Sequence, residues 1–167
     1  VEKVKMPSFK NPNNIVAGVG DYDNDGDTDI WWRNRQFGNN VLWRIEDMSR
    51  EEQIKIKKRK NAAWMPFGVG DLDGDGTDDI MFRHLASGVN EIALIDDFAI
   101  VSTESFASRA GSGWAVGGHY DADGDGKGDI VWRNVDTGAN QLWRLNNLTF
   151  DSLVNLVSEP DTDLRLP

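Results

Sequence analysis

Three short stretches of this chain carry an unusual density of carboxylates around a glycine. They read DYDNDGDTDI from Asp21, DLDGDGTDDI from Asp71 and DADGDGKGDI from Asp121, with aspartates at positions 1, 3, 5 and 9 of each stretch. Carboxylates this close together repel one another unless a cation lies between them. The chain has no cysteine, so oxygen atoms would have to hold that cation. We therefore predict that each stretch is a loop that binds a hard divalent cation.

Calcium suits these loops best, because it takes roughly six to eight oxygen ligands and alternating aspartates in a tight loop supply them. Glycine at position 6 permits the sharp turn. Position 7 holds Asp27, Thr77 and Lys127, and since a lysine side chain cannot coordinate a cation, this position is expected to contribute its backbone carbonyl. Three Ca²⁺ ions are therefore predicted, with these ligands: Asp21, Asp23, Asp25, Asp27 and Asp29; Asp71, Asp73, Asp75, Thr77 and Asp79; Asp121, Asp123, Asp125, Lys127 and Asp129.

The aspartate pattern of these loops has two alternatives to calcium binding and resembles one other calcium motif. Magnesium is a weaker alternative, since it dehydrates reluctantly and rarely uses an all-protein cage. Without any metal, the stretches would be solvated acidic turns. The helix-loop-helix calcium motif is excluded, because its position 12 requires glutamate and this chain has Trp32, Phe82 and Trp132 there.

The elements that position the loops also repeat at an interval of 50 residues. An apolar, glycine-rich segment precedes each loop and a segment such as DIWWRN or DIVWRN follows it; both kinds favour short strands. A turn with Gly38, Gly88 or Gly138 leads to a third strand, and a less regular fourth strand is expected from Ile54, around 100–106 and around 153–157. We predict an all-β fold of tandem four-stranded antiparallel blades of β-propeller type, about three repeats of 50 residues, over 11–60, 61–110 and 111–160.

The ends of the chain lie inside the repeating unit. Residues 1–10 match the fourth strand in register, with Val4 to Phe9 expected as the outer strand of a preceding blade. Residues 161–167 are expected to be the start of a further repeat or a tail. Closed propellers typically have about four to eight blades. The chain is therefore expected to be cut from a longer array, to assemble into a ring or to form an open stack.

Composition and the remaining side chains exclude several classes of function. The net charge of −10 argues against nucleic-acid binding, and no apolar run approaches the length of a membrane span. No cluster of acid, base and nucleophile is visible, and His84 and His119 have no metal-ligand partner at useful spacing. We therefore do not expect an enzyme.

Several recurring or unusual side chains have both a structural and a functional interpretation. Trp32, Phe82 and Trp132 are expected to pack between blades, although such aromatics could also stack on sugars. Arg33, Arg83 and Arg133 are expected to hydrogen-bond neighbouring strand ends or loop carboxylates. The basic cluster of Lys55, Lys57, Lys58, Arg59 and Lys60 is expected to protect an exposed edge strand, or to bind an anionic partner. Trp31 and Tyr22 break the repeat pattern and are candidates for specific contacts.

With FGVGDLDGDGTDDI from Phe67 and VWRN…TGANQLWRL from Val131, the chain resembles tandem FG-GAP or VCBS-type repeats. Such repeats form calcium-binding propeller blades in integrin α-subunits and in many bacterial surface proteins. The resemblance implies calcium ligation by the aspartates at positions 1, 3, 5 and 9 of each loop. Ala17 and Gly117 depart from the signature that Phe67 and Gly68 match, which affects packing and not the metal sites.

From these observations the chain is expected to be a calcium-stabilised extracellular or cell-surface module that binds a glycan or a protein ligand in adhesion. One alternative is a structural subunit that self-assembles into rings or filaments through incomplete blades. A second alternative is a non-catalytic part of a polysaccharide-active enzyme. Neither nucleic acid nor membrane insertion is expected.

Overall fold

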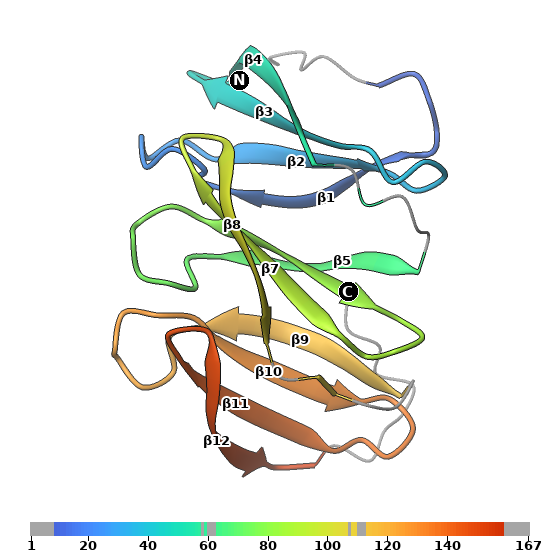
Figure 1. Cartoon of the computed structure of the whole chain (residues 1–167), viewed down its shortest axis with the longest axis vertical. Coiled ribbons are helices and arrows are strands. Elements are labelled where there is room, and N and C mark those ends of the chain that lie inside the picture. Colours follow the sequence, from blue (N-terminus) through green and yellow to red (C-terminus); the bar gives the residue numbers. More distant parts are fainter. Residues whose placement is uncertain (1–8, 58, 60–62, 107, 110–112, 159–167) are drawn as a thin grey trace, which may run out of the picture.

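A computed structural model describes residues 9–57, 59, 63–106, 108–109 and 113–158 of the chain (Figure 1). Within these residues, all regular structure is β. The strands of the first sheet are β1 (Asn14–Gly20), β2 (Asp29–Asn34), β3 (Asn40–Glu46) and β4 (Ser49–Ile56). The second sheet contains β5 (Trp64–Gly70), β6 (Asp79–His84), β7 (Asn90–Asp96) and β8 (Ala99–Phe106). The third contains β9 (Trp114–Tyr120), β10 (Asp129–Asn134), β11 (Asn140–Asn146) and β12 (Thr149–Leu156).

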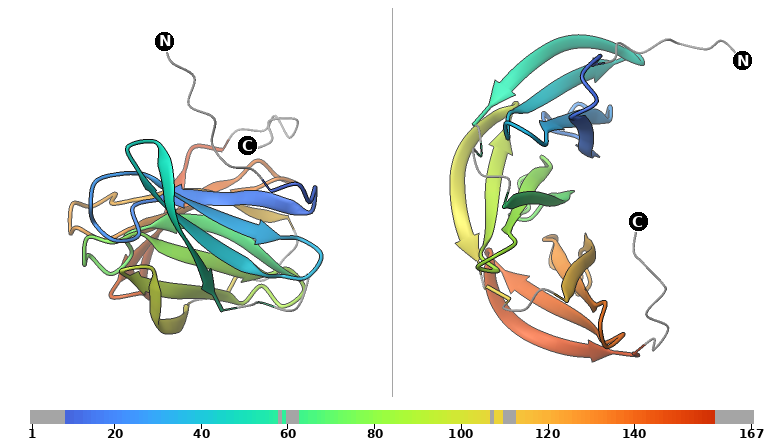
Figure 2. Two further views of the ribbon diagram at one scale, coloured as in Figure 1. Left: turned by 90° about the horizontal axis from the view of Figure 1, so that it is seen from above. Right: turned by 90° about the vertical axis from the view of Figure 1, so that its right-hand side faces the viewer.

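Each sheet is an antiparallel meander in which every strand pairs with its neighbours in the chain. The three sheets stack in an open arc, with β1, β5 and β9 on its inner side and β4, β8 and β12 on its outer side (Figure 2). The prediction of three tandem four-stranded antiparallel units is confirmed. The described residues do not close into a ring, so a complete propeller stays a prediction, as do the repeat boundaries.

The first three strands of each repeat lie where the sequence predicts them. Gly38, Gly88 and Gly138, at the turns between the second and third strands, have φ values of 68°, 70° and 72°. This is the left-handed region that favours glycine, as expected for these turns. The expected outer strand at Val4 to Phe9 lies outside the described residues except for Phe9, and residues 161–167 lie outside them as well.

The outer strands begin earlier than the sequence suggests. β4 starts at Ser49 and not at Ile54, and β12 starts at Thr149 and not near Leu153. The two residues between β3 and β4 both have positive φ, 47° at Asp47 and 60° at Met48, and the other two sheets repeat this tight turn. Two positive φ values define the turn that suits the twist of a hairpin. Because the first half of β4 is exposed, it lacks the apolar alternation that would have revealed it.

The core lies between the sheets. Trp31 and Phe82 meet edge to face at 5.1 Å between the first and second sheets, while Phe67 and Trp132 lie 6.2 Å apart between the second and third. The predicted packing role is thus confirmed for Phe82 and Trp132. Trp31 is 0% exposed, and Tyr22 is buried in the same cluster. The interpretation of these two residues as sites of ligand contact is therefore wrong.

Two of the recurring arginines form contacts that link one sheet to the next. Arg33 Nη2 donates to the carbonyl of Trp64 at 2.8 Å, and Arg83 Nη2 donates to that of Arg109 at 2.6 Å. The first is a strand-end hydrogen bond of the kind that the sequence predicts, because Trp64 begins β5, whereas Arg109 lies beyond the end of β8. On the inner side, glycine allows close approach: a Cβ added at Gly70 would clash with the His119 ring of the third sheet.

The basic cluster at 55–60 is not uniformly an edge-protecting surface. Lys55 and Lys57 are exposed, whereas Arg59 packs inward, with its guanidinium 5.2 Å from the Phe82 ring and 2.7 Å from Glu91 Oε2. The expectation is therefore wrong for Arg59, because the chain turns toward the second sheet at this point. Lys58 and Lys60 lie outside the described residues.

Candidate metal centre

Three aspartates converge in each loop. Each aspartate contributes one carboxylate oxygen, and the three oxygens lie within 4.8 Å of one another. The first site consists of Asp21, Asp23 and Asp29, the second of Asp71, Asp73 and Asp79, and the third of Asp121, Asp123 and Asp129. These are the residues at positions 1, 3 and 9. Each lies between the first and second strands of its sheet, where the predicted loop falls.

The position-1 aspartate organises the loop by accepting backbone hydrogen bonds. Gly26 N–H donates to Asp21 Oδ2 at 2.9 Å, and Asp25 N–H donates to Asp21 Oδ1 at 3.2 Å. Gly126 N–H donates to Asp121 in the same way at 2.9 Å, and this hydrogen bond lowers the pKa of the Asp121 carboxyl. In the third loop the backbone therefore favours an ionised carboxylate at Asp121.

The position-9 aspartate joins the loop to the third strand. Asp79 is buried, and it accepts hydrogen bonds from Leu72 N–H at 3.1 Å and Ile95 N–H at 3.0 Å, one on each carboxylate oxygen. Burial raises the pKa of Asp79 to about 7, and it raises the pKa of Asp29 to about 6, although the backbone hydrogen bonds oppose the shift. A cation beside these groups would relieve the cost of burying their charge.

Positions 5 and 7 behave differently from the converging residues. Asp25, Asp75 and Asp125 are exposed and stand outside the three triads; each accepts the N–H of the residue two places later, as Asp75 does from Thr77 at 2.8 Å. At position 7 the side chains turn toward the outer hairpin: Thr77 Oγ1 donates to the Ile95 carbonyl at 2.5 Å, and Lys127 Nζ donates to Asn147 Oδ1 at 2.6 Å. Coordination by positions 5 and 7 stays a prediction.

The backbone of each loop has the sharp turn that the glycines predict. Gly26, Gly76 and Gly126 at position 6 have φ values of 90°, 96° and 86°. Position 4 is also left-handed, with φ of 59° at Asn24 and 84° at Gly74. A side chain with Cβ would be strained at these glycines, so the loop sequence and the loop shape depend on each other.

The loops also contact one another across the sheet interfaces. Asp78 N–H donates to the Asp21 carbonyl at 2.7 Å, and Asp78 Oδ2 accepts from Asp21 N–H at 2.9 Å. Gly128 N–H donates to the Asp71 carbonyl at 3.1 Å in the same manner. The ordering of one loop is therefore connected to the position of the next sheet.

One position outside the loops makes the three sites unequal, and our sequence analysis missed it. Arg44 on β3 places Nε 2.9 Å from Asp23 Oδ2, whereas Arg144 on β11 is 3.9 Å from Asp123 Oδ2. At the same register on β7 the second repeat has Leu94. The signal was present in the aligned third strands VLWRI, EIALI and QLWRL, in which only the middle one lacks arginine.

The three triads fit a hard cation. Their converging donors are carboxylate oxygens, the ligand type that Ca²⁺ and Mg²⁺ prefer, and the loop backbone orients two of them through hydrogen bonds. A bound cation would supply positive charge that offsets the mutual repulsion of the aspartates. The chain's own residues hold the loop shape and anchor it to the sheet.

The described residues include no helix long and apolar enough to cross a membrane. A comparison with curated proteins found no match to the chain. A comparison with protein-family models found one family, described as FG-GAP-like repeat, over residues 21–82. That range begins at the first aspartate loop, includes the second loop and ends within β6. The resemblance to FG-GAP repeats that the sequence suggests is therefore confirmed over residues 21–82, which have the sequence of an FG-GAP-like repeat.

Proposed function

We propose that this protein is a calcium-stabilised binding module of the cell surface or extracellular space, which presents an ordered surface to a glycan or protein ligand in adhesion. The observation that carries this proposal is the convergence of three carboxylates at the same place in each of three stacked sheets. The FG-GAP-like match over residues 21–82 supports a β-propeller-like binding module. The proposal assigns the module a binding role and no catalytic one.

Calcium would act on the stack through the connections of each loop. In the first repeat, Asp21 reaches the second sheet through Asp78, and Asp29 reaches β3 through Ile45 N–H at 2.8 Å. Ca²⁺ bound between these carboxylates would fix the loop, its own sheet and the neighbouring sheet together. The millimolar calcium outside cells is sufficient for weak modular sites, which supports the extracellular assignment.

Thermal unfolding with calcium and with excess chelator tests the proposal. We expect the melting temperature to fall by several degrees in chelator, because metal that binds only the folded state stabilises it by mass action. The variant Asp79→Asn, which keeps the size of the side chain, should show a smaller difference between the two conditions. An unchanged melting temperature in chelator would contradict the calcium role. A glycan array and a peptide array, each probed in calcium, would then identify the ligand class.

Self-association is a second candidate function. The outer strand β12 leaves Phe150, Leu153, Val154 and Leu156 partly exposed in the described structure. Neighbouring apolar side chains on an edge strand favour pairing with another chain. Light scattering over a range of concentrations tests this: the mass should rise with concentration, and Leu153→Lys should abolish the rise. A monomer at every concentration would exclude it.

A further inference from the structure

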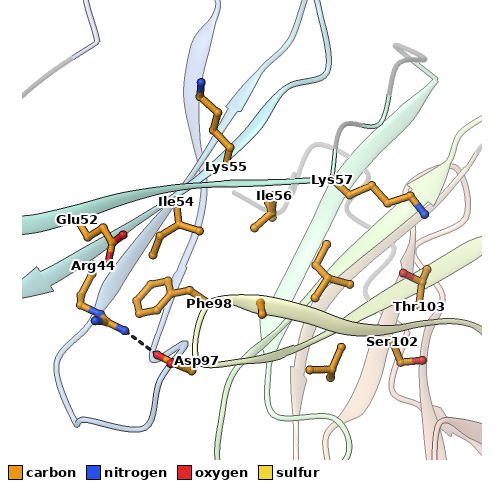
Figure 3. A pocket seen from close by; sticks show the side chains of 13 residues that line it. Arg44, Glu52, Ile54, Lys55, Ile56, Lys57, Asp97, Phe98, Ser102 and Thr103 are labelled. Carbon is orange, nitrogen blue, oxygen red and sulfur yellow. Dashed lines mark hydrogen bonds and ion pairs between the residues drawn. The ribbon is translucent and has the colours of Figure 1, made fainter.

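A groove of about 820 Å³ separates the outer strands of the first and second sheets (Figure 3). Its walls are formed by the second half of β4 and by β8, together with the turn that precedes β8. Ile54 and Ile56 line one wall and Ile100 and Val101 the other, with the buried Phe98 at one end. The groove is therefore the outward continuation of the core between the first two sheets.

Charges are distributed unevenly along this groove. Arg44 and Asp97 form an ion pair of 2.7 Å at the end beside Phe98, so they largely neutralise each other. Lys55 and Lys57 are exposed along the other half, and Figure 3 shows Lys57 extending across the groove toward Thr103. The Lys57 end of the groove is therefore suited to an anionic group, and the middle is suited to apolar side chains.

The backbone of β8 is available for pairing. In the described structure β8 is hydrogen-bonded only to β7, so its outer edge is open. Charged residues on an edge strand discourage pairing with another chain. The sequence of β4 includes Arg50, Glu51, Glu52 and Lys55, whereas β8 has Glu104 as its single charged residue. Val101 on β8 is also 60% exposed.

The corresponding outer strands of the second and third sheets provide an internal comparison. At the register of Ile54, β8 has Glu104, and at the register of Val101, β12 has Asp151. Ser105 replaces Lys55 in β8. The same register positions are therefore apolar or basic at the first interface and acidic or neutral at the second. The fold alone does not require this difference.

We propose that the groove between β4 and β8 binds an extended segment of a partner protein, with acidic side chains near Lys57 and apolar side chains over Ile54, Ile56 and Val101. Main-chain groups of the segment would pair with the open edge of β8, which is a general mode of peptide recognition. This inference rests on the proposed binding function, and it selects a protein ligand over a glycan.

Fluorescence polarisation with defined probes tests the proposal on the whole protein in calcium. One probe is a labelled peptide of about ten residues that alternates valine and glutamate, long enough to span an outer strand. A second probe replaces each glutamate by lysine. We expect the acidic peptide to bind at least tenfold more tightly than the basic one, because of charge complementarity with Lys55 and Lys57.

Variants locate the binding site. Lys57→Glu and Val101→Asp, the latter copying Asp151 at the same register of β12, should each weaken binding of the acidic peptide by about five- to tenfold. Lys10→Glu makes the same charge change at an exposed position outside the groove and should leave binding within about twofold. Equal weakening by Lys10→Glu, or no preference between the two peptides, would overturn the proposal.

Two further measurements separate this proposal from the calcium role. A sulfated hexasaccharide that binds at Lys57 while neither peptide binds would show a glycan site and overturn the peptide assignment. If chelator lowers the melting temperature but no peptide binds, the groove proposal fails and the calcium role stands. If the acidic peptide binds and the melting temperature is the same with and without chelator, the calcium role fails and the groove proposal stands.

Discussion

The first and second aspartate loops share their carboxylate pattern but have different surroundings. In the first repeat the outer turn places Met48 in solvent at 69% exposed, and Arg44 pairs with the loop carboxylate of Asp23. In the second repeat the same positions are Phe98, which is 2% exposed, and Leu94. The difference shows that the loop motif determines which oxygen atoms can bind a cation. Residues on the third strand and in the outer turn determine the surroundings of those oxygen atoms.

Interactions between the repeats account for much of this difference. Phe98 packs against the first sheet, its N–H donates to the Tyr22 carbonyl at 3.2 Å, and the Arg44 guanidinium lies 4.6 Å from its ring. Arg44 also bonds Asp97 in the same turn. The first site is therefore tied to the second repeat through Arg44, and the outer turn of the second repeat is part of the core.

The largest expected effect concerns the outer turns. Phe98→Ala should lower the free energy of unfolding by about 3–5 kcal/mol, because it removes a buried aromatic ring at the sheet interface. Met48→Ala, at the matching exposed position, should change it by less than about 0.5 kcal/mol. Urea unfolding of the two variants measures both. Similar losses for both would show that the two turns do not differ as described.

The buried position-9 aspartate should give the next largest effect. Asp79→Ala removes the acceptor of two buried N–H groups, those of Leu72 and Ile95, and should cost about 2–4 kcal/mol in calcium-free protein. Asp29→Ala should cost as much, since its hydrogen bonds are equivalent. Asp75→Ala, at an exposed position, serves as the control and should cost less than about 1 kcal/mol. Urea unfolding in chelator measures these free energies. An Asp79→Ala variant as stable as the unchanged protein would contradict the anchoring role of Asp79.

The two loops should also differ in their pH dependence. In calcium-free protein, carbon-13 NMR should give a higher pKa for Asp79, about 7, than for Asp29, about 6. Because both folded-state values lie above the ordinary aspartate value, their contribution to stability is fully present below that ordinary value. It is lost as the pH rises through about 6 to 7.

Unfolding of the calcium-free protein at pH 5 and pH 8 checks this sign. We expect the free energy of unfolding to be larger at pH 5 by about 2–4 kcal/mol. Calcium should oppose this trend, because metal binding requires ionised carboxylates and strengthens as the pH rises. The variant Asp79→Asn should flatten the calcium-free dependence. A stability that rises steadily from pH 5 to pH 8 without calcium would be the contrary result.

The smallest effect concerns calcium affinity at the individual sites. Arg44→Leu should raise the affinity of the first site and Leu94→Arg should lower that of the second, each by about threefold, since a partly exposed charge pair contributes modestly. Amide signals of Gly26 and Gly76 in a calcium titration followed by NMR report the two sites separately. Arg144→Leu, where the ion pair is 3.9 Å long, should change the third site less. Equal affinities in the unchanged protein would remove the basis of the comparison.

Because the sequence repeats every 50 residues, most strands of the fold can be predicted from it. The second strands are predicted from DIWWRN and its copies because apolar and β-branched residues in them face a core on both sides of the sheet. The sequence predicts too late a start for β4, because most of this strand is exposed and its start depends on the turn at Asp47 and Met48. The second turn residue is Met48, Phe98 or Leu148 and never glycine, so the usual hairpin signal was missing.

The candidate metal sites show a similar division. Carboxylate spacing and a positive-φ glycine are local properties, so the sequence by itself determined which loops can hold a cation and that three of them recur. Only the tertiary structure decided that Asp25 stands outside the triad, that Arg44 reaches Asp23 and that Trp31 is buried. These outcomes depend on contacts between strands and sheets that are distant in the chain. A local sequence pattern does not show which side chain from a distant strand will contact the loop.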